Sequence, residues 1–513
     1  MNQFSHSIPE SGMNTIQYSL AKTGKRTCTV NRIRLHSAYD PVKEAQRFVS
    51  GVDFGFIPKL IVVTEPALSY CVDFLRQAYP DAILVAIRFT HDFDEYNYLW
   101  DKVFDYDNVI QILNIYGEDV VLAAGFLSWQ PSQQVYSEEY NYCWQQIKNL
   151  VQTSRDILGT RAYFGKRWLK NTISFCSRVK NTSTIEPGTA PILLVASGPS
   201  LKSSLDYIIK YRDSFFLIAL SSALSPLLAA GIQPDICIST DGGYWAKRHI
   251  DFCSIPLALP AEAAIAAQLF EKNIIPLKYG DAPESELLDI CKIPSLQALR
   301  NGTVSGTALE LALTLTTGPV FACGLDLATA VGFQHCQPNR LEMAAEAKDQ
   351  RLTPKETRLF PQQLPSQSLE IYAQWFVSQS TRFKDRFYRL AHSSYQFSNR
   401  LGVIQDIDWK KFVAILAQYK KNKATVRFPV IRSVIIPDER QRYNLLLEAL
   451  ENYKQQKLPH HWLSTLLPAE QALLGRTLDK SELEAEIKDK SSKCINEIID
   501  YLKSIGEKKD HVI

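Results

Sequence analysis

Short apolar runs alternate with amphipathic stretches through the first third of the chain. The run PKLIVVTE (58–65) is apolar and β-branched, residues 67–79 have helical spacing, and a second apolar run, AILVAIRF, covers residues 82–89. A strand, a helix and a strand in this order predict a βαβ unit on a parallel sheet. No glycine-rich turn follows the first run, which ends in TEP. We therefore expect a small α/β domain with a structural role here.

Three segments around this unit complete the N-terminal part. Residues 1–30 are polar and aperiodic, which indicates an arm or an irregular cap, and residues 138–177 keep helical spacing over a long stretch. The segment NTSTIEPGTAP (181–191) is rich in Thr, Ser and Pro, which is typical of a linker. We therefore expect a first domain over residues 1–180.

The run ILLVASGPSL (192–201) predicts a strand that leads through a turn of small residues into a helix at 204–213. The turn contains Gly198, Pro199 and Ser200. Small residues between a strand and a helix let a phosphate or ribose approach the backbone, where the helix N-terminus faces the anion. Ser200 is also a good N-cap residue, so a capped turn without a ligand is the alternative.

A further strand ends in a second candidate ligand-binding turn. The run ICIST (236–240) is followed by Asp241, Gly242 and Gly243. Open α/β sheets place ligand-binding groups at the carboxyl ends of their strands. Asp241 can accept hydrogen bonds from ribose, base or sugar hydroxyls there, whereas a tight turn that only needs glycine is the alternative.

A hydroxyl-rich loop precedes the strongest helical pattern of the chain, NGTVSGTALELALTL (301–315). Thr303, Ser305 and Thr307 stand at the start of this helix. Hydroxyls and small residues at a helix N-terminus can hold a phosphate. The sequence therefore predicts a second anion-binding helix end.

The last apolar run of this part, PVFACGLDLA (319–328), predicts a strand with Asp326 just beyond it, and His335 follows nine residues later. A histidine on a loop beyond a sheet's carboxyl edge can act as a general base. A structural or exposed histidine is the alternative.

The remainder of the chain reads as helical. The stretch 366–400 places Ile371, Trp375 and Phe376 at helical spacing, which predicts a core-facing stripe. From Pro437 onward the chain is helical and rich in charge. Amphipathic helices of this kind pack on a neighbouring domain or bind a partner protein.

Composition limits the class of protein. With 513 residues the chain is long enough for two or three domains, and 46% hydrophobic and 22% charged residues are typical of a globular protein. A net charge of +3 without a basic stripe does not favour a nucleic-acid partner. The ten cysteines form no CxxC motif, so they predict buried free thiols in a reducing compartment. No signal-peptide core and no run of about 18 apolar residues occurs, so we expect a cytoplasmic protein without a membrane span.

Five motifs in order carry a resemblance to a known family. ASGPSL, AGIQPD, STDGG, NGTVSGTALELAL and ACGLDLA, with a histidine after them, resemble the central domain of the bacterial motility-associated factors, which glycosylate flagellin with nonulosonic acids. The same domain is similar to bacterial sialyltransferases that use CMP-activated donors, and more distantly to the archaeal pterin pyrophosphokinase MptE. The resemblance implies a Rossmann-like central domain over residues 188–410, between a small α/β N-terminal domain and a helical C-terminal region over 411–513.

The resemblance also implies roles for single residues. It places Asp326 after the last core strand and His335 where the general base lies, so these two are the expected catalytic residues. The residues expected to bind the nucleotide are Ser197, Gly198, Pro199, Ser200, Asp241, Gly242, Thr303, Ser305, Gly306 and Thr307.

Three positions depart from the related patterns. Ser197 stands where the sialyltransferases have an asparagine, and Ala328 stands in place of their phosphate-binding tyrosine. The acidic pair of the pyrophosphokinase metal site is reduced to Asp241, because Ser239 occupies the first acidic position. A metal-dependent phosphoryl transfer needs two or three oxygen ligands near the phosphates.

The expected function is a metal-independent glycosyltransferase that moves a sialic-acid-like sugar from a CMP-activated donor to Ser or Thr of flagellin. The expected partners are this nucleotide sugar and flagellin, with no further cofactor and no metal. Two alternatives stay open: a non-catalytic protein that binds a sugar nucleotide or flagellin, and an enzyme like the pterin pyrophosphokinase.

Overall fold

The structure, a computed structural model, describes residues 15–243, 246–250, 252–330, 333–352, 367–391, 398–421, 426–477 and 479–510. The chain divides into two compact units. Unit 1 contains Met1–Gly165 and Leu458–Ser492, and unit 2 contains Lys166–Lys457 and Lys493–Ile513. The fold is mixed α/β, as the sequence predicts, and parallel sheets form the centre of each unit.

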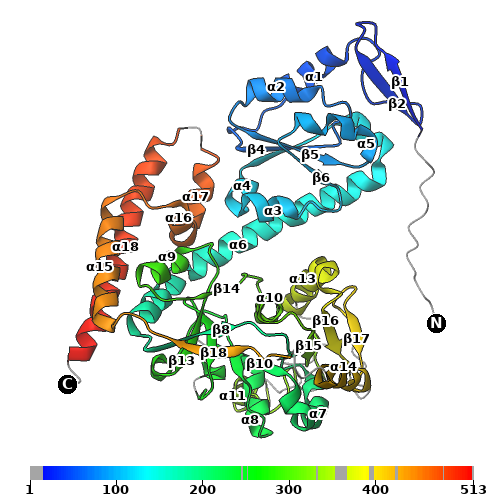
Figure 1. The fold of residues 1–513 in the computed structure, drawn as a ribbon. Helices are drawn as coiled ribbons and strands as arrows, with labels where there is room; N and C mark the ends of the chain where they lie inside the picture. The colour runs from blue at the N-terminus through cyan, green and yellow to red at the C-terminus, as the bar shows by residue number, and fades with distance from the viewer. Residues whose placement is uncertain are drawn as a thin grey trace. The chain divides into compact units, whose positions relative to one another are not determined.

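Unit 1 is built on a four-stranded parallel sheet in the order β6-β5-β4-β7 (Figure 1). The strands are β4 (Leu60–Thr64), β5 (Ile83–Arg88), β6 (Lys102–Asp105) and β7 (Ala124–Ser128). The expected βαβ unit is confirmed, since β4 and β5 are parallel neighbours joined through α2 (Cys71–Ala78). Every residue of β4 is buried because the sheet is covered on both faces.

The expectation of an irregular arm is wrong for residues 16–30. They form β1 (Ile16–Leu20) and β2 (Arg26–Val30), which pair antiparallel and continue into β3 (Ile33–Arg34). Cys28 and Val30 are fully buried in the core of unit 1. Only two apolar side chains of β2 reach this core, so the sequence pattern is too weak to reveal the strand. Residues 1–14 lie outside the described residues.

Seven further helices among the described residues lie wholly within unit 1. They are α1 (Pro41–Ser50), η1 (His91–Leu99), α3 (Gln111–Tyr116), α4 (Glu118–Leu122), α5 (Gln130–Val135), α16 (His460–Leu466) and α17 (Pro468–Leu474). The long helix expected at 138–177 is confirmed as α6 (Ser137–Arg178), which begins in unit 1 and ends in unit 2.

Unit 2 contains a large sheet in the order β17-β16-β15-β9-β10-β11-β12-β13-β8-β18, with β14 beside β13. All its pairings are parallel except that of β18 with β8. The strands are β8 (Asn181–Glu186), β9 (Ile192–Val195), β10 (Phe216–Leu220), β11 (Ile236–Ile238), β12 (Leu257–Pro260), β13 (Asn273–Lys278), β14 (Leu296–Gln297), β15 (Val320–Cys323), β16 (Phe387–Leu390), β17 (Gln405–Ile407) and β18 (Val430–Val434).

The strand order reverses at β9. From β9 the chain adds β10, β11, β12 and β13 on one side, and then returns to place β15, β16 and β17 on the other. Such a reversal leaves a crevice at the carboxyl ends of the two strands where it occurs. For this sheet the reversal lies at the carboxyl ends of β9 and β15.

Helices cover both faces of the sheet (Figure 1). One face packs against α10 (Val304–Leu315) and α13 (Gln367–Phe383), and the other against α7 (Leu205–Tyr211), α8 (Leu224–Ala229) and α14 (Trp409–Lys421). Of the predicted stripe on α13, Phe376 is fully buried and Trp375 partly so, whereas Ile371 is exposed. Residues 366 and 392–397 of the stretch 366–400 lie outside the described residues.

The segment expected as a linker is a strand over most of its length. Residues 181–186 form β8, which lies between β13 and β18. Thr182, Ser183 and Ile185 are buried, because this polar strand is covered by neighbours from distant parts of the chain. Its Thr- and Ser-rich composition therefore reflects a β-strand whose partners the local sequence does not reveal.

The C-terminal part is helical as expected, apart from β18. Its long helices are α15 (Glu439–Gln455) and α18 (Ser481–Asp510). Arg442 of α15 is buried and donates hydrogen bonds to the carbonyls of Cys176 and Val179 at the end of α6. A guanidinium at this position satisfies carbonyls that a helix C-terminus leaves without partners.

Two expectations from composition can be compared with the fold. All ten cysteines are free and buried, which confirms the predicted thiols. In the described ranges no helix has both the length and the apolar character needed to cross a membrane.

Candidate functional site

A carboxylate and a backbone turn meet at the reversal point of the large sheet. Ser200 donates two hydrogen bonds to Asp326, from its amide nitrogen to Oδ2 at 2.8 Å and from Oγ to Oδ1 at 2.6 Å. The Gly198 amide donates to the carbonyl of Gly324 at 2.7 Å. The loops that follow β9 and β15 are thus joined, and both carboxylate oxygens of Asp326 are occupied by Ser200.

The environment of Asp326 raises the pKa of its carboxyl group. The residue is buried, and burial raises the pKa of its carboxyl group, although the hydrogen bonds from Ser200 and the charge of Arg389 oppose this. Ser200 stands in the short helix η2 (Pro199–Ser204), and its hydroxyl binds Asp326 instead of capping the helix. The alternative reading of Ser200 as an N-cap is therefore wrong.

Hydrogen bonds and close packing also fix the other residues of this turn, from Ser197 to Pro199. Ser197 donates from Oγ to Ser222 Oγ at 2.7 Å, and its carbonyl accepts the amide of Cys336 at 2.6 Å. Pro199 is buried at the start of η2. A Cβ atom on Gly198 would lie 2.5 Å from Asp326 Oδ2, so glycine is required here by the carboxylate.

His335 lies next to this turn, because the amide of the adjacent Cys336 donates a hydrogen bond to the Ser197 carbonyl. The Nδ1 atom of His335 lies 2.9 Å from Glu342 Oε1, and the His335 amide donates to the same oxygen at 2.7 Å. Glu342 belongs to α11 (Arg340–Glu346), and Gln337 donates to its Oε2. A carboxylate bonded to Nδ1 fixes the ring and leaves Nε2 to face a substrate.

Glu342 remains ionised beside the imidazole. Burial alone would raise its pKa, but the hydrogen bond and charge of His335, with the amides of His335 and Gln334, lower the pKa below its usual value. The sequence reading missed Glu342, although an acid seven residues after a candidate base was a signal that could have found it.

The N-terminus of α10 carries hydroxyls but no side-chain cap. Thr303 occupies the N-cap position with extended dihedral angles, yet its side chain makes no capping hydrogen bond. Its Oγ1 lies 2.9 Å from Ser305 Oγ, and Thr307 Oγ1 donates to the carbonyl of Leu299 at 2.8 Å. The first amides of a helix have no partner within the helix, so this end can receive an anion.

Gly306 is explained by a neighbouring side chain. A Cβ atom at this position would lie 2.9 Å from the indole of Trp375 on α13. Gly242 is similar, since its Cβ would lie 2.4 Å from the indole of Trp168 on α6. The glycines of the predicted nucleotide-binding loops are therefore needed for packing against protein side chains, whatever they do for a ligand.

The turn after β11 is also tied to α6. Asp241 is exposed and accepts the amide of Gly243 through Oδ1 at 2.7 Å. Asn171 of α6 donates to the carbonyls of Gly242 at 3.3 Å and Glu262 at 2.8 Å. The exposed carboxylate of Asp241 thus lies in a turn at the carboxyl edge of the sheet, and hydrogen bonds from Asn171 hold this turn in place.

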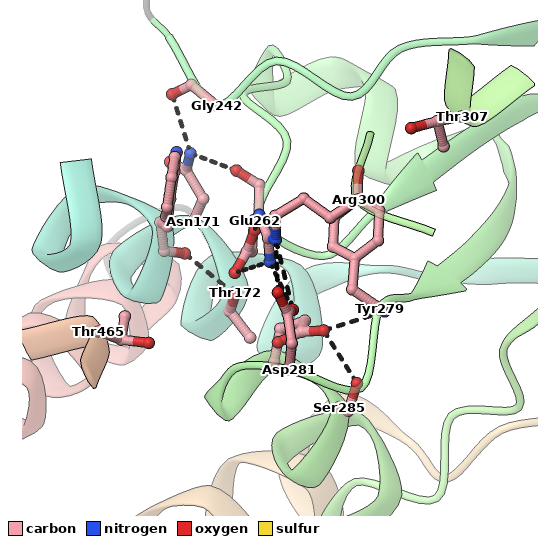
Figure 2. A network of polar contacts seen from close by, with 12 residues as sticks. Asn171, Thr172, Gly242, Glu262, Tyr279, Asp281, Ser285, Arg300, Thr307 and Thr465 are labelled. Carbon is pink, nitrogen blue, oxygen red and sulfur yellow. Dashed lines mark hydrogen bonds and ion pairs between the residues drawn. The ribbon is translucent and has the colours of Figure 1, made fainter. Parts of the chain in front are cut away.

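A dense polar network continues along this edge (Figure 2). Arg300 binds Glu262 through Nη1 at 2.8 Å and Asp281 through Nε at 3.0 Å, and its guanidinium lies 4.2 Å from the centre of the Tyr279 ring. Glu284 accepts the amide of Tyr279 at 3.0 Å. Burial, with the charges of Glu262 and Asp281, raises the pKa of Glu284 to about 7, although Arg300 opposes this. The sequence reading missed this network, since its members lie far apart in the sequence.

The described part of the chain contains no evident metal-binding site. No three His, Cys, Asp or Glu side chains gather there as ligands of an ion would.

Part of unit 2 matches a known family model. Residues 166–332 match the model described as MptE-like, 6-hydroxymethylpterin diphosphokinase MptE-like. These residues form an MptE-like domain. The domain begins in α6 and includes β8 to β15 of the large sheet, so it contains the Ser200–Asp326 junction and the N-terminus of α10. The expected likeness to MptE is confirmed for this part of the chain.

Two proteins of one organism also match over part of their length. A protein of Treponema pallidum (strain Nichols) is 33% identical over 273 residues, which cover 52% of this chain and 60% of that protein. A second protein of this organism is 25% identical over 238 residues, which cover 44% of this chain and 40% of that protein. The matches therefore span less than two thirds of either relative.

Solved structures were compared as well. The Maf glycosyltransferase from Magnetospirillum magneticum AMB-1 aligns with a TM-score of 0.48 and 12% identity, over 98% of this chain and 93% of that chain.

Proposed function

We propose that the MptE-like domain is a glycosyltransferase that uses a CMP-activated, sialic-acid-like sugar. The observation that carries this proposal is the open N-terminus of α10, where Thr303 and Ser305 bond to each other and leave the first amides of the helix uncapped. Amides at a helix N-terminus stabilise a phosphate, both in a bound nucleotide and as a leaving group. The resemblance of the five motifs to the motility-associated factors, whose central domain is similar to the sialyltransferases, supports the same donor.

In this proposal the nucleotide lies along the carboxyl edge of the sheet. The turn Ser197–Ser200 lies under the CMP moiety, Asp241 accepts from a ribose or sugar hydroxyl, and the phosphate meets Ser305 and the α10 amides. The reversal of strand order at β9 and β15 marks the place where open α/β sheets hold such ligands. Asp326 acts by fixing the turn, since both its oxygens bind Ser200.

The reaction needs a base and a leaving group. His335 takes the proton of an acceptor hydroxyl through Nε2, while Glu342 holds Nδ1 and stabilises the imidazolium that forms. The acceptor oxygen forms a bond to the anomeric carbon as the bond from that carbon to the phosphate oxygen breaks. The CMP phosphate keeps the electron pair.

The acceptor and location extend the same proposal. We propose Ser or Thr of flagellin as the acceptor, no metal as cofactor, and the cytoplasm as the location, to which ten free thiols are suited. No nucleic-acid partner is proposed.

A second candidate is diphosphokinase activity, which the description of the matching family model favours. This reaction moves a diphosphate from ATP to a hydroxymethyl pterin. The metal site of such an enzyme would have only one acidic residue after β11, Asp241, because Ser239 occupies the position of the other acidic residue. ATP binding that depends on magnesium would identify this candidate.

Calorimetric titration with CMP, ATP and UDP, with and without magnesium, tests these proposals. We expect saturable CMP binding without metal that Ser305→Ala weakens about tenfold. Thr314→Ala is the matched control, because Thr314 lies on the same helix at an exposed position. ATP binding only with magnesium would favour the diphosphokinase, and no binding of any nucleotide would exclude both enzymes and leave a protein-binding fold.

A further inference from the structure

The guanidinium of Arg300 makes two two-pronged ion pairs. Nη1 and Nη2 bind both oxygens of Glu262 at 2.8 and 3.2 Å, while Nε and Nη2 bind Asp281 at 3.0 Å each. The Tyr279 ring covers its face. Two bidentate pairs use the planar fork of arginine, which lysine cannot reproduce. This geometry fixes the backbone at Arg300 to the ends of β12 and β13.

The loop that contains Arg300 leads directly to the open end of α10. Thr303 and Ser305 follow within five residues, and Thr307 returns a hydrogen bond to Leu299. The Arg300 ion pairs and the hydrogen bond from Thr307 therefore hold the loop on both sides. Between them, the buried side-chain nitrogen of Asn301 has no hydrogen-bond partner among the described residues.

Glu262 also connects this loop with the turn after β11. Its carboxylate binds Arg300, and its carbonyl accepts from Asn171, whose same nitrogen donates to the Gly242 carbonyl (Figure 2). The Ala264 amide donates to the carbonyl of Asp241 at 3.0 Å. Hydrogen bonds thus connect the Asp241–Gly242 turn with Glu262 and Arg300, and the adjacent Leu299 carbonyl accepts from Thr307 of α10.

We propose that Glu262 and Arg300 are positioning residues that join the Asp241–Gly242 turn and the N-terminus of α10 into one preorganised nucleotide-binding unit. The nucleotide part rests on the proposed function, whereas the joining of the two loops does not. A site held in its bound geometry loses less conformational freedom on binding, so affinity is greater. Neither residue touches the ligand in this proposal.

Hydrogen–deuterium exchange of the ligand-free protein tests the joining. We expect Arg300→Lys and Glu262→Gln each to increase exchange in both segments, residues 241–243 and 299–306. Asp281→Asn is the matched control, because Asp281 binds the same guanidinium from the end of β13, outside the path through Glu262, and its side chain is 39% exposed. Faster exchange in only one segment, or an equal change throughout unit 2, would overturn the proposal.

CMP titration of the same variants tests the consequence. We expect Arg300→Lys to weaken binding about tenfold and Asp281→Asn to change it less. In a double-mutant cycle, Glu262→Gln and Ser305→Ala should be non-additive, which a general loss of stability would not produce. Wild-type affinity in Arg300→Lys would overturn the positioning role while the proposed function stands. If the wild type binds no nucleotide, the proposed function fails, and exchange alone decides whether the loops are joined.

Discussion

Ser200 and Asp326 lie 126 residues apart in the sequence and are joined by two hydrogen bonds, one from the backbone and one from the hydroxyl of Ser200. The bonds join the loops that follow β9 and β15, where the strand order of the large sheet reverses. A residue expected to be catalytic is therefore occupied in holding a turn. Its contribution to a reaction would be through the position of that turn.

The role of Asp326 can be tested by comparing two substitutions. Asp326→Asn keeps an acceptor for the Ser200 amide and suits burial, so we expect turnover within about tenfold of wild type, whereas loss of a general acid or base costs about 10²–10⁴. Asp326→Ala leaves the buried Ser200 amide without a partner and should lower the free energy of unfolding by about 1–3 kcal/mol. Steady-state kinetics and urea unfolding measure the two effects. A complete loss of turnover in a folded Asp326→Asn variant would restore the catalytic assignment.

The His335–Glu342 pair should govern turnover without governing donor binding. We expect His335→Gln to reduce the transfer rate by about 10²–10⁴, because no base then receives the acceptor proton. Glu342→Gln should cause a smaller loss, since the imidazole remains but its orientation and charge stabilisation weaken. Single-turnover kinetics beside CMP titration separates rate from affinity.

The matched control for this pair is His91→Gln, since the His91 side chain is 83% exposed and lies in unit 1. It should leave both quantities unchanged. A fall in CMP affinity as large as the fall in rate would place His335 in donor binding and contradict its role as a base.

Gly306 should tolerate no side chain. The Cβ of Gly306→Ala would lie 2.9 Å from Trp375, so we expect the free energy of unfolding to fall by about 1–3 kcal/mol, with the N-terminus of α10 displaced. Gly159→Ala is the control, because Gly159 lies in α6 with open space around it and alanine favours a helix by about 0.5–1 kcal/mol. Thermal unfolding distinguishes them. Restoration of stability in the double variant Gly306→Ala/Trp375→Leu would confirm the indole as the cause.

Glu284 should make stability depend on pH. Burial raises the pKa of Glu284 to about 7 in the folded protein, whereas its ordinary pKa is near 4.5. Between these two pH values the folded protein keeps a proton on Glu284 that the unfolded chain releases. The free energy of unfolding should therefore fall as pH rises from about 4.5 to about 7, by roughly 3 kcal/mol from this group. Chemical unfolding between pH 5 and 8 measures the slope.

Glu284→Gln should flatten this slope, since an amide keeps the acceptor for the Tyr279 amide but does not titrate. Asp289→Asn on the same helix, α9 (Pro283–Ile290), is the control because its side chain is 64% exposed. An unchanged slope in Glu284→Gln would show that other groups dominate the pH dependence.

Much of the fold follows from local sequence. Apolar runs such as ILLV at 192–195 and the helical pattern from Val304 to Leu315 specify their elements, because hydrophobic periodicity and turn residues act over a few neighbours. The same local rules place Ser200, Asp241 and Thr303 after strands or before helices. The sequence thus determined an α/β sheet with polar turns at its strand ends, and its motifs indicated the MptE-like domain.

Tertiary structure alone decided which of these turns meet. Placing β15 beside β9 brings Asp326 to Ser200, and pairing with β13 and β18 turns the polar segment 181–186 into a strand. It also decided that Gly306 faces Trp375 and that Arg300 joins two loops. Strand order, close approach and ion pairing depend on burial between segments far apart in the chain, and no short-range pattern encodes these contacts.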